Sequence, residues 1–402
     1  MTLPGTSPTA GTSVVVVAQR AGQWLERCIA SLQPQAEQIV VVDNGSDANE
    51  VTAAGRRAGT AVVTNDRNRG FAGGVNSGLA MVTGDVVALL NDDATADPTW
   101  LSGAVEVLRD PSVAAVGPKV LLEQPYAEVR LDSEPWFAPG DARPLGRRLT
   151  SVQCGGSDVL SALVGPGVHG LERQGADRWR WTRGSGPIFV PLDEAHSPVV
   201  VDGEEVETRA VHRLVNSAGV YLRPDGAAGD YGFGAVDDGR FDVDGERFGL
   251  SGVALVTRAD TLARLGGLAE PFFAYYEDVD WCWRMRLAGL RLVYDPTSTV
   301  THRRSLTSGG TDNPRVRFLG ERNRLLAVAR NAPAPVARGL MTKAWREQNQ
   351  PGIRAGLGRL LPWALWSRAT TLRSTRRCSA KEVWQRWAGA DLSWGTGEGT
   401  EW

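Results

Sequence analysis

The sequence has few cysteines, no long apolar run and little net charge, and each absence excludes a class of protein. Its 4 cysteines lie far apart among 402 residues and form no CxxC pair, so we expect neither a zinc motif nor a disulfide framework, as in a reducing interior. No run of 18 apolar residues occurs, so no membrane-spanning helix is expected. The formal net charge of -2 provides no overall attraction to nucleic acid, and no nucleic-acid partner is expected.

A signal segment is also missing from the beginning of the sequence. Residues 1–11 are polar and contain Gly and Pro, without the basic stretch and following apolar stretch of a signal peptide. We expect these residues to form a disordered lead and the protein to be cytoplasmic.

Charge is distributed unevenly along the chain. From Arg338 to Trp387 there are 11 Lys and Arg against 2 Glu, a net charge of +9, and 7 of the 14 tryptophans lie between Trp345 and Trp402. Cationic, Trp-bearing helices lie in membrane interfaces, which predicts peripheral contact with the inner face of a membrane. A helical tail packed on the rest of the protein, with a solvated basic face, is an equal alternative.

The first 125 residues alternate between β-branched runs and segments with apolar residues at helical spacing. Strands are predicted at 13–19, 38–46, 60–66, 85–92 and 112–121. Helices are predicted at 22–32, 49–59, 74–81 and 98–110, the last with Asp97 as its N-cap. Apolar strands that alternate with amphipathic helices predict an α/β fold with a parallel sheet covered on both faces.

Composition divides the remainder of the chain. From 125 to 245 the helical spacing disappears and short strand-like runs follow one another, which predicts a β-rich insertion. Residues 246–333 return to the regular pattern, so we expect them to complete the domain begun by 12–124. Residues 334–402 form the basic, Trp-rich tail, predicted to be helical and broken by Pro351 and Pro362.

Polar side chains follow three predicted strands where each strand ends. Asp43 ends the second strand, Asn65 and Asn68 follow the third, and "NDD" at 91–93 ends the fourth. Ligands of parallel sheets bind beyond these carboxyl ends. Ordinary polar capping explains any one position, but three together favour a site. Since neighbouring Asp92 and Asp93 repel each other, a divalent cation is the ligand that resolves the pair.

Three further segments carry candidate chemistry. The glycine-rich stretch "NDRNRGFAGGVNSGL" (65–79) permits close backbone approach by a phosphate or sugar. Glu277 and Asp278 open a predicted helix after two tyrosines, a partly shielded position that suits a general base, although acids also stabilise a first helical turn. His302 directly follows a predicted strand. A lone histidine is usually structural, and a metal would make it functional.

These motifs, in this order, resemble the family 2 glycosyltransferases, inverting enzymes with the GT-A fold that use nucleotide sugars. The resemblance extends over about 12–125 and 246–333 and includes "VDNGS", "NRGFAGGVN", "LLNDD", "GPKVL", "FFAYYEDVDWCWRMRLAG" and "ERNRLLAVARNAP". It is greatest to bacterial members that build rhamnose- or galactofuranose-containing polysaccharides. The resemblance implies that 12–124 is the nucleotide-sugar-binding half of the GT-A domain and 246–333 the acceptor-binding, catalytic half.

The resemblance also implies roles for individual residues. Asp278 would be the general base, with Glu277 beside it, and Asp93 and His302 would hold Mn²⁺ or Mg²⁺. The nucleotide-sugar contacts would come from a larger set: Asp43, Asn44, Ser46, Asn68, Gly70, Asn91 and Asp92. The implied reaction transfers a sugar from a nucleotide-diphosphate sugar to a hydroxyl of a glycan or lipid-linked acceptor in cell-wall or polysaccharide biosynthesis.

Two departures from the family pattern keep alternatives open. Asn91 stands where the DxD motif has its first acid, and the first strand runs into "VVAQRAG" where many relatives have "VTYN". The alternatives are a nucleotidyltransferase and a catalytically weakened glycan-binding or scaffolding relative. The first normally has a Gly-rich loop with Arg or Lys directly after the first strand, which "AQRAGQW" matches poorly.

Overall fold

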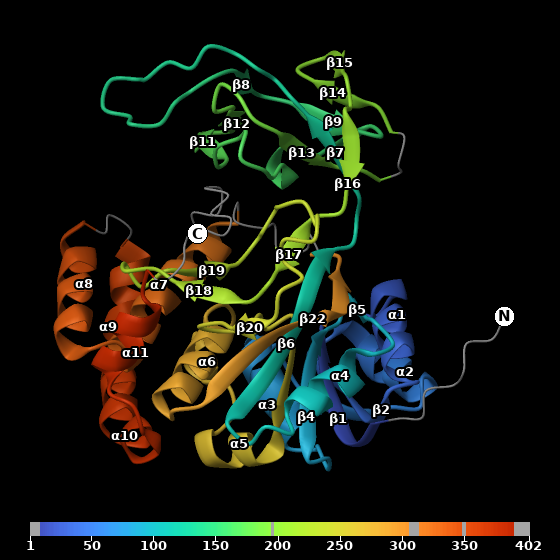
Figure 1. Ribbon diagram of the computed structural model, residues 1–402, viewed down its shortest axis with the longest axis vertical. Helices are drawn as coiled ribbons and strands as arrows, with labels where there is room; N and C mark the ends of the chain where they lie inside the picture. Colours follow the sequence, from blue (N-terminus) through green and yellow to red (C-terminus); the bar gives the residue numbers. More distant parts are fainter. Residues whose placement is uncertain (1–8, 194–196, 305–312, 348–350, 390–402) are drawn as a thin grey trace.

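The computed structural model describes residues 9–193, 197–304, 313–347 and 351–389 (Figure 1). It has an α/β body, a β-rich lobe above this body and a group of C-terminal helices along one side. The predicted α/β fold with a β-rich insertion and a helical tail is confirmed.

Residues 9–122 alternate between strands and helices as their sequence pattern predicts. The strands are β-branched runs buried on both faces, except for the less buried edge strand β3, and the helices turn their apolar residues toward the sheet. The elements are β1 (Thr9–Ala18), α1 (Gln23–Leu32), β2 (Ala36–Asn44), η1 (Asp47–Asn49), α2 (Glu50–Arg57), β3 (Ala61–Asn65), α3 (Gly70–Leu79), β4 (Val86–Asn91), β5 (Ala94–Ala96), α4 (Trp100–Val107) and β6 (Val113–Leu122).

The starts of β1 and α4 differ from the prediction. β1 begins at Thr9, inside the segment expected to be disordered, because Thr9 pairs with Ala36 across a register shift. Asp97 is not the N-cap of α4, which begins at Trp100 after Thr99. The Asp97 carboxylate instead accepts hydrogen bonds from the backbone N–H and hydroxyl of Thr99 in the preceding turn.

The later part of the chain completes the same body. Its elements are β21 (Ala254–Arg258), α5 (Ala259–Leu265), η3 (Glu270–Phe272), α6 (Glu277–Leu287), β22 (Arg291–His302) and α7 (Pro314–Asn331). The central sheet has the order β20–β22–β6–β21–β4–β1–β2–β3, with β1 parallel to β2 and β4. The sequence predicts a parallel sheet, but the observed sheet is mixed, because β21 runs antiparallel between β4 and β6.

The predicted insertion is divided between two parts of the molecule. Its first part forms the upper lobe: β7 (Tyr126–Val129), β8 (Arg148–Leu149), β9 (Val152–Cys154), β10 (Ser157–Asp158), η2 (Leu160–Ala162), β11 (Glu172–Gln174), β12 (Asp177–Trp181), β13 (Ile188–Pro191), β14 (Val199–Val201), β15 (Glu204–Val206) and β16 (Ala210–His212). Its second part returns to the body: β17 (Val215–Ser217), β18 (Val220–Leu222), β19 (Ala228–Asp230) and β20 (Gly245–Glu246). β17 pairs with β6, and β20 pairs with β22.

The tail packs on the body. Its helices are α8 (Ala334–Glu347), α9 (Pro351–Ala369), α10 (Thr371–Thr375) and α11 (Ala380–Trp387). Pro362 was expected to break the helix but lies inside α9, whose neighbouring Leu357 and Ala364 are buried in a core shared with α6 and α7. Trp384 stacks on Trp283 with ring centroids 5.9 Å apart.

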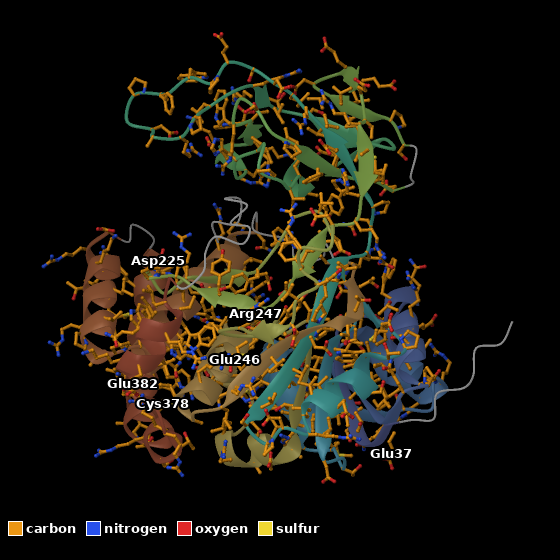
Figure 2. The ribbon with its side chains drawn as sticks, in the orientation of Figure 1. Glu37, Asp225, Glu246, Arg247, Cys378 and Glu382 are labelled. Carbon is orange, nitrogen blue, oxygen red and sulfur yellow. The ribbon has the colours of Figure 1, made fainter. Side chains whose placement is uncertain are left out.

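Glu246 joins the tail to the sheet (Figure 2). Its carboxylate accepts hydrogen bonds from Arg286 of α6, Arg291 of β22 and Arg386 of α11. The packed-tail alternative therefore describes these helices. None of the helices in the described part of the chain has the length and hydropathy needed to cross a membrane.

Candidate active site

One cavity of about 410 Å³ gathers most of the predicted site residues at the carboxyl end of β4. It lies between β4, the start of α6 and the end of β22, and it is also bordered by the β18–β19 hairpin. The predicted residues that line it are Asn91, Asp92, Asp93, Glu277, Asp278 and His302. Residues separated by about two hundred positions thus form one site.

Strand pairing places Asp93 beside His302. β5 and β22 pair antiparallel with Ala94 opposite His302, and the backbone N–H of Arg303 donates to the carbonyl of Asp93. His302 Nε2 consequently lies 3.1 Å from Asp93 Oδ1.

These two side chains fit a divalent cation. Asn216 Oδ1 lies 2.8 Å from His302 Nδ1, and since this oxygen only accepts, Nδ1 carries a hydrogen and a neutral ring turns its Nε2 lone pair toward Asp93. A lone pair and a carboxylate oxygen repel at this distance unless a proton or a cation lies between them. Asn91 Oδ1 is buried and has no hydrogen-bond partner within the described residues, so it remains available to a ligand. Imidazole with carboxylate suits Mn²⁺.

The diphosphate of a sugar donor and water would fill the remaining coordination positions of such a cation. Across the ranges that the structure describes, no group of three His, Cys, Asp or Glu side chains is arranged to hold a metal ion. Burial and the adjacent charge of Asp93 raise the pKa of Asp92 to about 7. Added positive charge at this position would favour the ionised form of Asp92.

Asp278 has a better environment for a general base than Glu277. Two backbone N–H groups, those of Gly252 and Val279, donate to Asp278 at 2.9 and 2.7 Å, whereas Glu277 Oε2 is buried without a partner in the described residues. Burial raises the pKa of both groups, and the charge of Asp278 raises that of Glu277 further. Asp278 therefore ionises first and Glu277 keeps its proton.

Asp280, two residues along the same helix, is structural. It is fully buried and accepts hydrogen bonds from Arg284, Arg330 and Asn331. Although burial opposes ionisation, Arg330 and Arg284 hold the pKa of Asp280 below its usual value. This carboxylate ties α6 to α7 and so fixes the helix that carries Asp278.

A strained loop leads to Asp278, the predicted general base, and Asn323 holds this loop. Phe273, Tyr275 and Tyr276 have φ angles of 70, 69 and 70°, a conformation that costs free energy for residues other than glycine. The Asn323 amide donates to three carbonyls around this loop, those of Phe272, Ala274 and Tyr275. Asn323 lies within "ERNRLLAVARNAP", but sequence reasoning assigned it no role, because its partners lie about fifty residues earlier in the chain.

The glycine-rich stretch is fixed by a network around Asn44. Asn44 donates to the Gly70 carbonyl at 3.0 Å and accepts from Asn65 and from the Arg69 N–H. Asn68 Oδ1 accepts from the Gly70 N–H at 2.7 Å, which explains why α3 begins at Gly70, four residues before the predicted start. Asn44, Asn68 and Gly70 thus shape this loop, and their contacts with a nucleotide sugar stay predictions.

Asp43 has a structural use in the same region. It is completely buried and accepts hydrogen bonds from the N–H and hydroxyl groups of Ser46 and Thr52. Although burial acts against them, these bonds lower the pKa of Asp43. Neither Asp43 nor Ser46 lines the cavity, so their predicted contact with the base stays a prediction.

The cavity residues outside the predicted set include Asn216, Asp230, Phe233 and Arg304. The first three belong to the part of the insertion that returns to the body. Their positions depend on the pairing of β17 with β6, for which the local sequence has no signal. Arg304 follows His302 by two residues and lies over the ring of Phe233.

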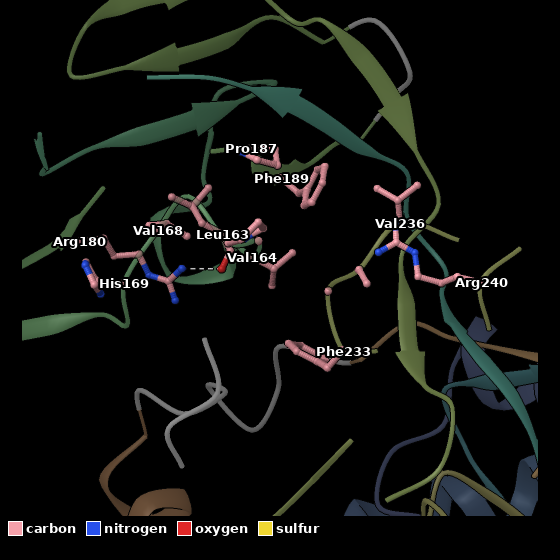
Figure 3. Close-up of a pocket in the computed structure, with 14 residues that line it drawn as sticks. Leu163, Val164, Val168, His169, Arg180, Pro187, Phe189, Phe233, Val236 and Arg240 are labelled. Carbon is pink, nitrogen blue, oxygen red and sulfur yellow. Dashed lines mark hydrogen bonds between the residues drawn. The ribbon is translucent and has the colours of Figure 1, made fainter. Parts of the chain in front are cut away.

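A second cavity, of about 330 Å³, lies between the lobe and the returning part of the insertion, and it shares Phe233 with the first (Figure 3). Its lining is mostly apolar, with His169, Arg180 and Arg240 and no carboxylate side chain. The predicted reaction needs a carboxylate as its general base, so the first cavity is the candidate active site.

Comparisons with known proteins identify the class to which this chain is similar. Residues 13–149 match the family model described as glycosyl transferase family 2. Over 312 residues the chain is 25% identical to the N-acetylglucosaminyl-diphospho-decaprenol L-rhamnosyltransferase of Mycobacterium tuberculosis, covering 74% of this chain and 77% of that protein. Over 111 residues it is 31% identical to the pre-mycofactocin glycosyltransferase of the same species, covering 27% of this chain and 23% of that protein.

The crystal structure of GalNAc-T7 with UDP, GalNAc and Mn²⁺ has a similar fold, with a TM-score of 0.55 at 11% sequence identity. The match covers 95% of this chain and 56% of that one, so the chain spans little more than half of GalNAc-T7. Fold, site and comparisons define the class: this protein is a glycosyltransferase with the GT-A fold. Within that class, residues 13–149 are similar to glycosyl transferase family 2, which favours glycosyl transfer over nucleotidyl transfer.

Proposed function

We propose that this protein transfers a sugar from a nucleotide-diphosphate sugar to a hydroxyl group of a glycan or lipid-linked acceptor, with inversion at the anomeric carbon and with the aid of Mn²⁺ or Mg²⁺. One observation carries the proposal: the Asp93–His302 pair and the Asp278 carboxylate line the same cavity. The Asp93–His302 pair suits the diphosphate end of a donor, and the Asp278 carboxylate suits the acceptor hydroxyl.

The chain's own residues divide the reaction between them. Asp278 accepts the proton of the acceptor hydroxyl as its oxygen attacks the anomeric carbon from the side opposite the diphosphate. Asn216 holds the His302 ring in place, and the Asn44 network holds the loop at Gly70. A bound divalent cation would supply Lewis-acid stabilisation of the leaving diphosphate. Positioning and electrostatics provide most of the rate.

The similarity to the mycobacterial rhamnosyltransferase supports a particular acceptor. Its name specifies transfer to an N-acetylglucosaminyl group linked through diphosphate to a polyprenol, and the match covers 77% of its length. An N-acetylglucosaminyl-diphospho-lipid is therefore the acceptor proposed here, within cell-wall polysaccharide biosynthesis. Such a substrate places the enzyme in the cytoplasm at the inner face of the membrane.

Exposed side chains of α9 support contact with that membrane. Leu365 and Trp366 are 50% and 62% exposed, and the exposed Arg373 follows them in α10. Apolar and cationic side chains together bind anionic interfaces.

We expect the protein to sediment with phosphatidylglycerol vesicles at low salt, and we expect Trp366→Ser to weaken this binding. Phe137→Ser is the matched control, because Phe137 is 63% exposed on the distant lobe. Equal sedimentation of all three proteins would contradict a role for α9.

A donor panel tests the function directly. UDP-, GDP- and dTDP-linked sugars are incubated with the protein and Mn²⁺, and the released nucleoside diphosphate is measured with and without an N-acetylglucosaminyl-diphospho-lipid. We expect one donor to be hydrolysed slowly alone and turned over faster with the lipid. EDTA should abolish both reactions, and Mn²⁺ or Mg²⁺ should restore them.

The panel also separates the alternatives. Release of nucleoside diphosphate in EDTA at the full rate would remove the metal role from Asp93 and His302. No turnover of any donor would favour the glycan-binding or scaffolding relative over an enzyme.

A further inference from the structure

The β18–β19 hairpin, from the second part of the insertion, borders the catalytic cavity next to the general base. Val220 pairs with Asp230 across the hairpin and with Gly249 on its other side. The Ala228 N–H donates to the Tyr276 hydroxyl at 3.1 Å, so the hairpin is attached to the loop that ends at Asp278. The end of β19 therefore has a defined position beside Asp278.

That position is occupied by a second carboxylate. Asp230 lines the cavity together with Asp278, and in the part of the chain that the structure describes no Lys or Arg forms an ion pair with it. Burial, together with the charge of Asp278, raises the pKa of Asp230 to about 6, although a hydrogen bond from Ser217 opposes the shift. The positive charge of Arg304, which also lines the cavity, lowers the pKa of Asp230 without forming an ion pair with it. A carboxylate taken from water without an ion pair destabilises the folded protein, so folding alone does not account for Asp230.

The surroundings of Asp230 suit the acceptor better than the donor. The leaving diphosphate is anionic and belongs at the Asp93–His302 end, whereas the attacking hydroxyl must reach Asp278. An ionised carboxylate only accepts hydrogen bonds, and sugar hydroxyls are donors. Glu277, which also lines the cavity, has an Oε2 atom that is buried without a partner in the described residues, and this leaves another oxygen for a polar ligand.

We propose that Asp230 binds the acceptor sugar, accepting hydrogen bonds from hydroxyl groups beside the one that attacks, and so determines which hydroxyl reaches Asp278. This role rests on the proposed glycosyl transfer. It assigns acceptor specificity to the second part of the insertion, which forms this wall of the cavity.

The test compares two reactions in one variant. In Asp230→Asn, hydrolysis of the donor in the absence of acceptor is measured alongside transfer to the N-acetylglucosaminyl-diphospho-lipid. We expect the KM for the lipid to rise about tenfold or more, because the variant loses a hydrogen bond to a charged group. Donor hydrolysis, donor KM and Mn²⁺ affinity measured by calorimetry should stay within about twofold of wild type.

Asp225→Asn is the matched control, because Asp225 lies at the exposed turn of the same hairpin, outside the catalytic cavity (Figure 2). It should leave the KM for the lipid unchanged. Asp230→Glu, which keeps the charge and moves it by one methylene group, should raise the KM for the lipid and lower the fraction of product with the wild-type linkage.

An unchanged KM for the lipid in Asp230→Asn, with active wild type, would overturn the role of Asp230 and leave the proposed function intact. Weaker Mn²⁺ binding or slower donor hydrolysis in this variant would also overturn it, by placing Asp230 on the donor side. Wild-type protein that neither hydrolyses a donor nor transfers to the lipid would overturn the proposed function and this role with it.

Discussion

At the scale of single residues, the sequence distinguishes acids of the candidate site from structural acids only in part. Asp93 and Asp278 could be predicted, because the carboxyl ends of strands define the binding edge and the shielded helix start suits a base. Asp230 could not, since it lies in a segment without any regular period. Nor could the role of Asp280, which follows the base by two residues and depends on Arg330 of a distant helix.

The assignment of the base leads to a first prediction. Asp278→Asn should lower kcat for transfer by about 10²–10⁴-fold, the usual contribution of a general base. Donor binding, measured by calorimetry, should be nearly unchanged, because Asp278 faces the acceptor. Glu277→Gln is the control and should keep most of the activity, since Glu277 carries its proton already. An active Asp278→Asn enzyme would remove Asp278 from this role.

A second prediction concerns pH. Asp278 works only when ionised, and burial raises its pKa above the ordinary value of 3.8. As pH falls through this raised pKa the base becomes protonated, so kcat/KM should fall on the acid side, above pH 3.8, with a slope of one proton. Glu277→Gln should keep this acid limb. Its disappearance in that variant would assign the titration to Glu277.

At the scale of elements, the strands and helices of the first 125 residues follow from their periodicity, but the contact between α3 and the loop before α6 does not. Gly70 has a φ of 73°, and a Cβ at this position would lie 2.3 Å from the carbonyl oxygen of Phe273. The Ala72 N–H donates to this same carbonyl. The glycine-rich stretch therefore shapes the active site partly by receiving the backbone that leads to Asp278.

Two glycine variants test this contact. Gly59 has nearly the same φ, 72°, but no atom within 4 Å of an added Cβ. Gly59→Ala should lower the free energy of unfolding by about 1–2 kcal/mol, the strain of alanine in this conformation. Gly70→Ala should lower it further and should also reduce kcat, because backbone must move. Equal unfolding curves and equal activities for the two variants would contradict the contact.

At the scale of the whole molecule, the sequence predicts two halves of one domain separated by an insertion, but not where the insertion ends in space. Composition changes near 125 and 245, whereas the chain rejoins the main sheet at Val215, which pairs with Leu121. This return is a pairing of distant strands, and no local pattern indicates it. The packing of the tail on α6 and α7 is hidden for the same reason, because it depends on long-range contacts such as Trp283 with Trp384.

The two boundaries predict opposite results for two deletions. Tyr126 and His212 are direct partners in β7 and β16, so residues 127–211 can be replaced by a two-residue Asn-Gly turn without moving the strands. This variant loses the packing of Phe189 on Tyr126, so its midpoint of thermal unfolding should fall. Its unfolding should stay cooperative, and it should still hydrolyse the donor, because the lobe carries none of the acids of the catalytic cavity. Deletion of 125–245 removes β17, β20, Asn216 and Asp230, and should give a protein without a cooperative transition. Cooperative unfolding and activity in the longer deletion would restore the predicted boundary at 245, and their loss in the shorter one would show that the lobe and the body fold as one unit.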